Sequence, residues 1–213
     1  MNQIAYGGLT AHEPAERQNQ RALAKQRTRE KLLGAARVLF AERGYEGATI
    51  RDIAKSAGMS TGAVFASFTD KSDLFTEIAE TDMASLYASM RQAAEGLSGQ
   101  EAILAMLDAA VDHRLPTLAL FQAIQSALWT PGLSDLIRRR LDRRTAASLL
   151  HVVVKQDICP DGSGGCSHLI ADMIWDGCIA VLRRAALDGL TAELVKARIH
   201  QQTNTILAGL RRG

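Results

Sequence analysis

Hydrophobic positions recur with a helical period along most of the chain. In the segment 27–43, four apolar residues are spaced as one stripe of a helix: Leu32, Ala36, Leu39 and Phe40. Two shorter apolar groups follow at 53–57 and 64–68. This pattern predicts one long helix and then two short ones, each with a single buried side.

The rest of the chain shows no alternating strand pattern. Apolar residues at helical spacing predict further helices at 71–95, 100–114, 117–129, 134–156, 167–187 and 191–210. Pro116, Pro131–Gly132 and Gly189 separate several of them, because these residues end helices. We therefore expect an all-α protein of about nine helices.

The stretch 49–68, TIRDIAKSAGMSTGAVFASF, has the features of a helix-turn-helix. Thr49 and Ser60 can each cap a helix start, and Gly58 can end the first helix within one residue. Ala54 and Ala57 are small enough for two helices to cross closely. In this motif the second helix enters the major groove of DNA.

The patterns divide the chain into three parts. Residues 1–22 lack sustained periodicity and are expected to form a flexible arm. Arg17, Arg21 and the nearby Lys25 would let it touch DNA; a tail without a role is the alternative. Residues 23–70 would form a three-helix DNA-binding domain. Residues 71–213 would form a helical bundle for regulation and dimerisation.

Composition and charge agree with this division. Hydrophobic residues make up 47% of the 213 residues and aromatic residues 5%, which favours helices. The chain has no apolar run long enough to span a membrane and no signal-peptide pattern, and its three cysteines do not suggest a disulfide framework, so we expect a cytoplasmic protein. Between Arg21 and Phe75, ten Lys/Arg face six Asp/Glu, so positive charge gathers around the helix-turn-helix.

The span from Thr28 to Leu74 resembles the DNA-binding domain of the TetR family of transcriptional regulators. The resemblance rests on LLGAARVLF, on ERGYEGATIRDIAKSAGMSTGAVFASF, and on Lys71 and Leu74. It implies a homodimer that pairs through its last two long helices and binds a palindromic operator in double-stranded DNA. It also implies a C-terminal domain that responds to a small-molecule effector.

The resemblance also implies which residues contact DNA. Thr49 and Arg51 belong to the first short helix, whereas Phe65 and Ser67 stand where the family often has Tyr and His. Phe65 lacks the hydroxyl that would bond a phosphate but can pack on sugar or a thymine methyl; the alternative is that it belongs to the core. The expected contacts are Arg27, Thr49, Arg51, Ser60, Thr61, Gly62, Ala63, Phe65, Ser67 and Lys71.

Candidate effector and metal sites are less defined. Six residues could line a cavity between helices, although side chains of these kinds are more often core: Tyr87, Met106, His113, Phe121, Trp129 and Trp175. Cys159, Cys166 and His168 share a Gly-rich loop and carry soft metal ligands, but their spacing is not a standard zinc spacing. An incidental set in a flexible loop is the leading interpretation. We expect no cofactor, metal or enzymatic activity.

We expect a transcriptional repressor, released from its operator when an effector moves the helix 71–95 and so changes the separation of the two recognition helices. One alternative is a metal- or redox-responsive regulator that uses the Cys159–His168 loop. A second is a ligand-independent DNA-architectural or partner-binding module, which predicts a bundle without a cavity. A helical enzyme with an incidental DNA-binding fold would instead need a deep polar cleft.

Overall fold

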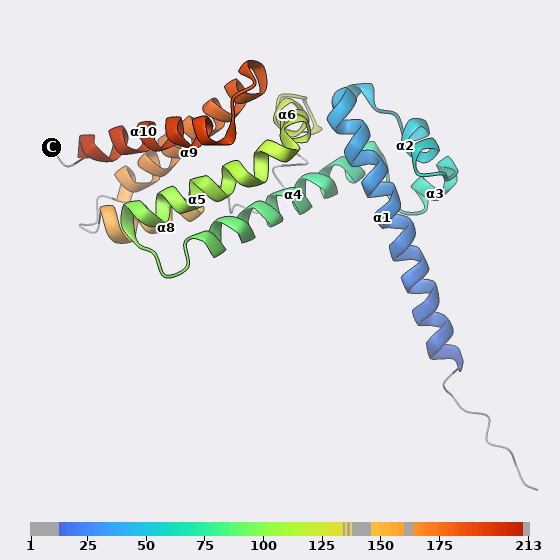
Figure 1. Ribbon diagram of the computed structural model, residues 1–213. Helices are drawn as coiled ribbons and strands as arrows, with labels where there is room; N and C mark the ends of the chain where they lie inside the picture. The colour runs from blue at the N-terminus through green and yellow to red at the C-terminus, as the bar shows by residue number, and fades with distance from the viewer. Residues whose placement is uncertain (1–12, 134, 136, 138–145, 160–163, 211–213) are drawn as a thin grey trace, which may run out of the picture.

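The computed structural model describes residues 13–133, 135, 137, 146–159 and 164–210, and every regular element in these residues is helical (Figure 1). The helices are α1 (Glu13–Gly47), α2 (Ile50–Ser56), α3 (Thr61–Phe65), α4 (Lys71–Ala93), α5 (Gly99–Arg114), α6 (Leu118–Ala127), α8 (Ala146–Val153), α9 (Gly164–Asp188) and α10 (Ala192–Leu210). A 3₁₀ turn, Leu115–Thr117, joins α5 to α6, and a π-helical turn, Val154–Ile158, follows α8. The all-α prediction is confirmed.

Three capping side chains set the starts of the helices around the helix-turn-helix. The hydroxyl of Thr49 accepts from Asp52 N at 3.1 Å, and that of Ser60 accepts from Ala63 N at 3.2 Å. Asp70 does the same for α4. Each cap satisfies a backbone donor that has no partner within its helix. The predicted starts at Thr49 and Ser60 are confirmed.

Helix α1 begins earlier than the sequence pattern predicts. The part of the expected flexible arm from 13 to 22 is a helical continuation of α1, and residues 1–12 lie outside the described residues. Side chains 17–27 are exposed, so packing does not hold this segment in a helix. Its Ala, Gln, Arg, Lys and Leu residues are strong helix formers. Because they form no apolar stripe, hydrophobic periodicity does not predict this part of the helix.

Two apolar cores organise the molecule. The N-terminal core joins residues of α1, α2 and α3 to the first turns of α4 and to α6, which contributes Leu120, Ile124 and Ala127. Leu133 and Ile137 also belong to it. Helix α6 therefore packs against α1, although helices α2 to α5 lie between them in the sequence. Helix α4 contributes residues to both cores, and Figure 1 shows it running from beside α1 to beside α5.

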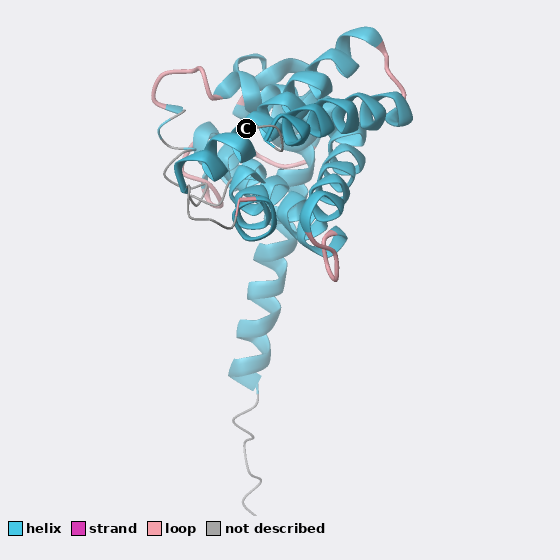
Figure 2. Ribbon diagram, turned by 90° about the vertical axis from the view of Figure 1, so that its left-hand side faces the viewer, coloured by secondary structure: helices cyan, strands magenta, loops and turns pink. Residues whose placement is uncertain are grey.

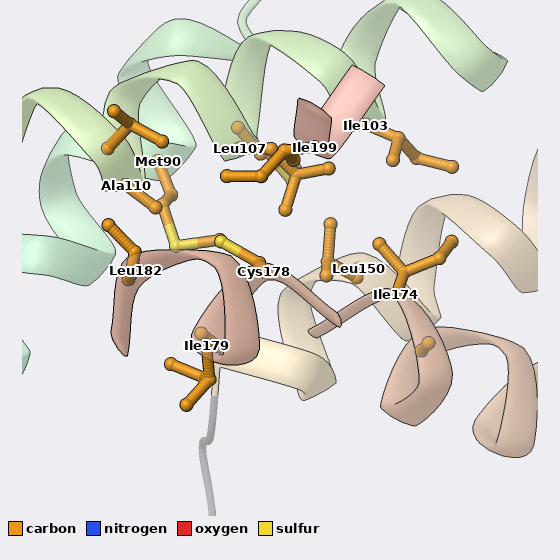
Figure 3. Packing of buried hydrophobic residues seen from close by; sticks show 14 of the residues in the cluster. Met90, Ile103, Leu107, Ala110, Leu150, Ile174, Cys178, Ile179, Leu182 and Ile199 are labelled. Carbon is orange, nitrogen blue, oxygen red and sulfur yellow. The ribbon is translucent and has the colours of Figure 1, made fainter. Parts of the chain in front are cut away.

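The C-terminal core lies between the second half of α4 and helices α5, α8, α9 and α10. Figure 3 shows Met90, Leu107, Ile174 and Cys178 within it. Burial raises the pKa of the Cys178 thiol to about 12, so this cysteine is a protonated, apolar group at neutral pH. Within the described residues, no helix is both long and apolar enough to cross a membrane.

A buried ion pair joins α4 to α5 inside this framework. Arg114, the last residue of α5, is 2% exposed and donates to the carboxylate of Asp82 on α4. Its guanidinium also lies 4.9 Å from the ring centre of Phe121 on α6. His113 Nε2 lies 3.5 Å from the other oxygen of Asp82. One side chain therefore contacts both α4 and α6, the two helices that enter the N-terminal core.

Replacing Arg114→Met should lower the free energy of unfolding by about 3–5 kcal/mol, because it leaves the Asp82 carboxylate buried without its cation. Urea denaturation followed by circular dichroism measures this change. The double variant Asp82→Leu/Arg114→Met should be more stable than the single one, because it removes both charges. A single variant as stable as the unaltered protein would contradict this role for the pair.

Candidate nucleic-acid interface

Helix α3 is held by two buried side chains and presents the rest of its length to solvent. Val64 and Phe68 are buried in the N-terminal core. On the opposite side, Ser60, Thr61, Gly62 and Phe65 are exposed, and Phe65 alone is 58% exposed despite its apolar ring. The interpretation of Phe65 as core is therefore wrong. A short helix that projects an exposed aromatic residue can enter a groove.

The turn between α2 and α3 fixes the angle at which α3 projects. Gly58 adopts φ 68°, a left-handed conformation that suits glycine. Met59 N donates to Ala54 O at 2.8 Å and Gly58 N to Lys55 O at 3.1 Å, which closes the end of α2. Ala54 is buried at this contact. The helix-turn-helix predicted from Gly58 and the small alanines is confirmed.

The start of α2 forms a second exposed part of the surface. The Thr49 hydroxyl donates to the Asp52 carboxylate at 2.7 Å, which lowers the pKa of Asp52, and Arg43 Nη1 lies 3.6 Å from the same carboxylate. Asp52 in turn donates its backbone N–H to the Thr49 hydroxyl, so Thr49 caps α2 while the Asp52 carboxylate accepts the hydroxyl proton. Arg51 is exposed beside them.

Arg29 is an organising residue that sequence reasoning did not single out. From α1 it donates to both carboxylate oxygens of Glu77 on α4, with Nε to Oε1 at 3.0 Å, and to the backbone oxygen of Ser67. Its guanidinium also covers the ring of Phe68 at 4.1 Å. Arg29 therefore fixes the end of α3 to α1 and α4. Its place among four cations between 21 and 29 hid this role.

Lys71, expected to reach a phosphate, is engaged within the protein. Its ammonium donates to Tyr45 O at 2.9 Å, lies 4.1 Å from the Tyr45 ring centre, and is 4.0 Å from Glu46. Burial, and then the charges of Glu46 and Asp70, raise the pKa of Tyr45. An ammonium has three donors, so the bond to Tyr45 leaves capacity for a phosphate.

The ten expected DNA contacts fall mainly on one continuous part of the chain, from the start of α2 to the start of α4. Seven are exposed, including Arg27 on α1, while Ala63, Ser67 and Lys71 are half-buried. Their role in binding DNA stays a prediction.

The six predicted pocket residues lie in different surroundings, and their role in binding an effector stays a prediction. Met106 and Phe121 are buried in the C-terminal core, and Tyr87 and Trp175 pack against it. His113 lies beside Asp82. Phe121 and Trp129, which is 82% exposed, do share a hollow of about 400 Å³ between α6 and α9; its other lining residues are Gln122, Gln125, Ser126 and Arg183.

The candidate metal ligands are not gathered into a site within the described part of the chain, where no group of three or more His, Cys, Asp or Glu residues could hold an ion. Cys159 is half-buried and Cys166 is exposed. The His168 ring stacks on that of His151, with centroids 3.5 Å apart, and His151 Nε2 lies 3.1 Å from Ser167 Oγ. Burial, and then the neighbouring His168, lower the pKa of His151.

The helix-turn-helix, its projecting α3 and the basic residues around it define the class of helix-turn-helix DNA-binding proteins. Residues 32–78 match the family described as "Bacterial regulatory proteins, tetR family". Together with a relative that aligns over most of its length, this match shows that the chain belongs to the TetR family of transcriptional regulators.

That relative is the HTH-type transcriptional repressor AcnR of Corynebacterium efficiens, which is 30% identical over 180 residues, 78% of this chain and 88% of its own. AcnR of Corynebacterium diphtheriae is 48% identical over 56 residues, which span 26% of this chain and only 30% of that protein. Among solved structures, FadR of Bacillus subtilis in complex with stearoyl-CoA has a TM-score of 0.67 at 18% identity, covering 85% of this chain and 96% of that one. This last likeness shows the fold alone.

The exposed ring of Phe65 provides a test that separates folding from DNA binding. Phe65→Ala should change the free energy of unfolding by no more than about 0.5 kcal/mol, because the ring is exposed. It should weaken binding to the operator by roughly tenfold, about 1.4 kcal/mol. Urea denaturation and fluorescence anisotropy with a labelled duplex measure the two quantities. Val38→Ala, at another exposed apolar position of the same domain, is the control and should alter neither.

Proposed function

We propose that this protein is a repressor that binds a palindromic operator as a homodimer and leaves it when a small molecule binds the C-terminal domain. The observation that carries the proposal is the projection of α3, capped by Ser60 and backed by Val64 and Phe68, with Phe65 left in solvent. Because an operator palindrome mirrors a two-fold axis, two copies of α3 would read two half-sites one helical turn apart.

The outer faces of α9 and α10 support the proposed dimer. Leu169 and Met173 on α9 and Leu194 on α10 are large apolar residues left exposed. Two open hollows, of about 790 and 690 Å³, follow α10 and the α9–α10 boundary. Apolar residues beside a shallow hollow are the arrangement that a second helix pair fills.

Charge introduced on this face should separate the subunits. Leu169→Arg/Met173→Arg should convert a dimer into a 23.0 kDa monomer, because the interface would bury unpaired charges. Sedimentation equilibrium measures the mass, and operator affinity should fall with it. The control Val152→Arg, at an exposed apolar position of α8, should stay dimeric. A double variant that remains dimeric would move the interface elsewhere.

The hollow between α6 and α9 is the proposed effector site. Its volume of about 400 Å³ lies within the range of small-molecule sites. The exposed ring of Trp129 offers flat apolar surface, while Arg183 supplies a cation and Gln122 and Gln125 supply amides. This combination favours a ligand with an apolar or aromatic body and an acidic group.

Helix α6 would carry the signal, because its two sides belong to different parts of the molecule. Phe121, Gln122 and Gln125 line the hollow, whereas Leu120 and Ile124 lie in the N-terminal core. A ligand that moves α6 would therefore shift the population of orientations of the DNA-binding domain. The route predicted from sequence, through α4, runs parallel to this one, since Arg114 contacts both helices.

The alternative functions have less support. A ligand-independent architectural module predicts a bundle without a cavity, and the α6–α9 hollow argues against that. An enzyme would need free titratable groups in a cleft, but the carboxylates of Asp108 and Asp112 are bonded by His200 at 2.8 Å and Lys196 at 2.7 Å from α10. The AcnR relatives are described as repressors, which favours repression over activation.

Selection of bound fragments from random duplex DNA would test the function and supply the operator. The effector site has its own test, because Trp129 and Trp175 are the two tryptophans of the chain. In a Trp175→Phe variant, small aromatic and aliphatic acids that release the operator should also change the emission of Trp129. Arg183→Gln should raise the concentration needed for release without changing operator affinity. Compounds that release DNA while Trp129 emission stays constant would place the effector elsewhere.

A further inference from the structure

The exposed side of α3 carries neither a charge nor an amide. The segment 60–69, STGAVFASFT, contains α3 and both of its flanks, and its only polar side chains are hydroxyls. The nearest cations of the motif, Arg51 and Lys55, are exposed on α2 instead. Figure 1 shows α2 and α3 together at the edge of the molecule, far from α9 and α10. A neutral helix beside cationic neighbours separates two tasks, because phosphate contacts position a protein whereas base contacts give it specificity.

Among the described residues, a helix is the only regular element that can read bases. The major groove of DNA admits an α-helix or a two-stranded β-ribbon. Figure 2 shows helices and loops but no strand in the part of the chain that the structure describes. In a helix-turn-helix the second helix enters the groove, and here that helix is α3. The residue types of α3 therefore limit which bases this protein can recognise.

Those residue types match one base. Arg or Lys forms paired hydrogen bonds with guanine, Asn or Gln forms them with adenine, and Asp or Glu accepts from cytosine. The segment 60–69 has none of these side chains. It exposes the ring of Phe65 and, one turn earlier on the same side, the methyl-bearing Thr61. Phenylalanine rings and threonine methyls pack against the C5 methyl of thymine.

Gly62 is a second feature of this side, and the protein itself does not require it. Gly62 is exposed and helical, and its φ is not positive. A methyl group in its place would meet only Ser60 Oγ, at 3.7 Å, which is an ordinary contact. Alanine would fit and would favour the helix, because glycine lowers helix stability. A glycine of this kind is expected where another molecule approaches the backbone closely.

We infer that α3 recognises thymine methyl groups in the major groove, so that each operator half-site carries A·T pairs where α3 enters it. Phe65 and the methyl of Thr61 contact the thymines, and Gly62 lets the helix approach the bases. The inference deepens the proposed function and rests on it, because it needs a bound duplex. It also decides between sugar and thymine methyl as the partner of the Phe65 ring, since a sugar contact carries no sequence information directly.

Replacing thymine by deoxyuridine tests the inference, because uracil differs from thymine only in lacking the C5 methyl. Each thymine of the selected operator is changed in turn, in both half-sites at once. At positions that α3 reads, the change should weaken binding by roughly threefold to tenfold, since a buried methyl contributes about as much as a buried CH₂ group. Fluorescence anisotropy with labelled duplexes measures the affinities. The same change outside the half-sites should have no effect.

Variants of α3 assign each methyl contact to a side chain. In Phe65→Ala and in Thr61→Ser, at least one uracil penalty should shrink to less than about twofold, because the partner of that methyl is gone. Thr61→Val keeps a methyl and removes the hydroxyl, so it should keep the penalty. Phe65→Ala is expected to fold, because the ring is exposed.

Gly62→Ala tests the close approach separately. It should raise the urea concentration at the midpoint of unfolding, because alanine favours the helix. It should also weaken operator binding by roughly tenfold, because the added methyl occupies space that DNA needs. Gly34→Ala is the matched control, since Gly34 is an exposed glycine of α1 and an added methyl there would meet nothing within 4 Å. The control should raise stability in the same way and leave operator affinity unchanged.

The outcomes separate this inference from the proposed function. If the unaltered protein prefers no duplex, the proposed function fails and takes this inference with it. If the protein has an operator but no uracil substitution weakens binding by more than about twofold, α3 does not read thymine methyls and the inference alone is wrong. Penalties that all persist in Phe65→Ala and Thr61→Ser would assign the methyl contacts to another element and would also overturn it. Full operator affinity in Gly62→Ala would contradict the close approach on which the inference depends.

Discussion

The structure depends on the fact that the helix-turn-helix cannot close its own core. Helices α1 to α3 surround Phe40, Ile53 and Val64, but a unit of this size buries little apolar surface and is marginally stable by itself. The deficit is met by the first turns of α4 and by Leu120 and Ile124 of α6. Because these helices also belong to the C-terminal half, the recognition helix cannot keep its orientation if they move.

The buried pair Asp82–Arg114 stands at the point where these connections meet. Taking a carboxylate and a guanidinium out of water costs several kcal/mol, which apolar residues in the same place would avoid. The pair is directional where apolar contacts are not: the guanidinium bonds α4 and faces the Phe121 ring on α6. It joins α5 to α4 and places the guanidinium against α6, so under the proposed function a movement of α6 would reach α4 through this pair.

Local patterns predicted most of the elements because local chemistry determines them. The caps Thr49 and Ser60 and the left-handed Gly58 act within four residues, and all three behave as their residue types suggest. Features that join distant segments were missed or misplaced. Arg29 bonds a residue 48 positions away, and α6 packs against α1, neither of which leaves a periodic signal. Composition also does not separate a ligand site from a core: Met106 and Phe121 have residue types found in ligand sites, and both are buried.

The extension of α1 is a helix that apolar periodicity does not predict. An apolar stripe reveals where a helix packs, so the segment 17–27, whose side chains are exposed, carries no stripe and resembles an arm. The signal left in 17–27 is the spacing of its charges. The formal net charge of the chain is only +2, because acidic residues elsewhere offset these cations. The total charge therefore does not reveal where the cations lie. For a protein that meets a regular polyanion, the position of each cation on its helix decides what it can bind, whereas the total charge does not.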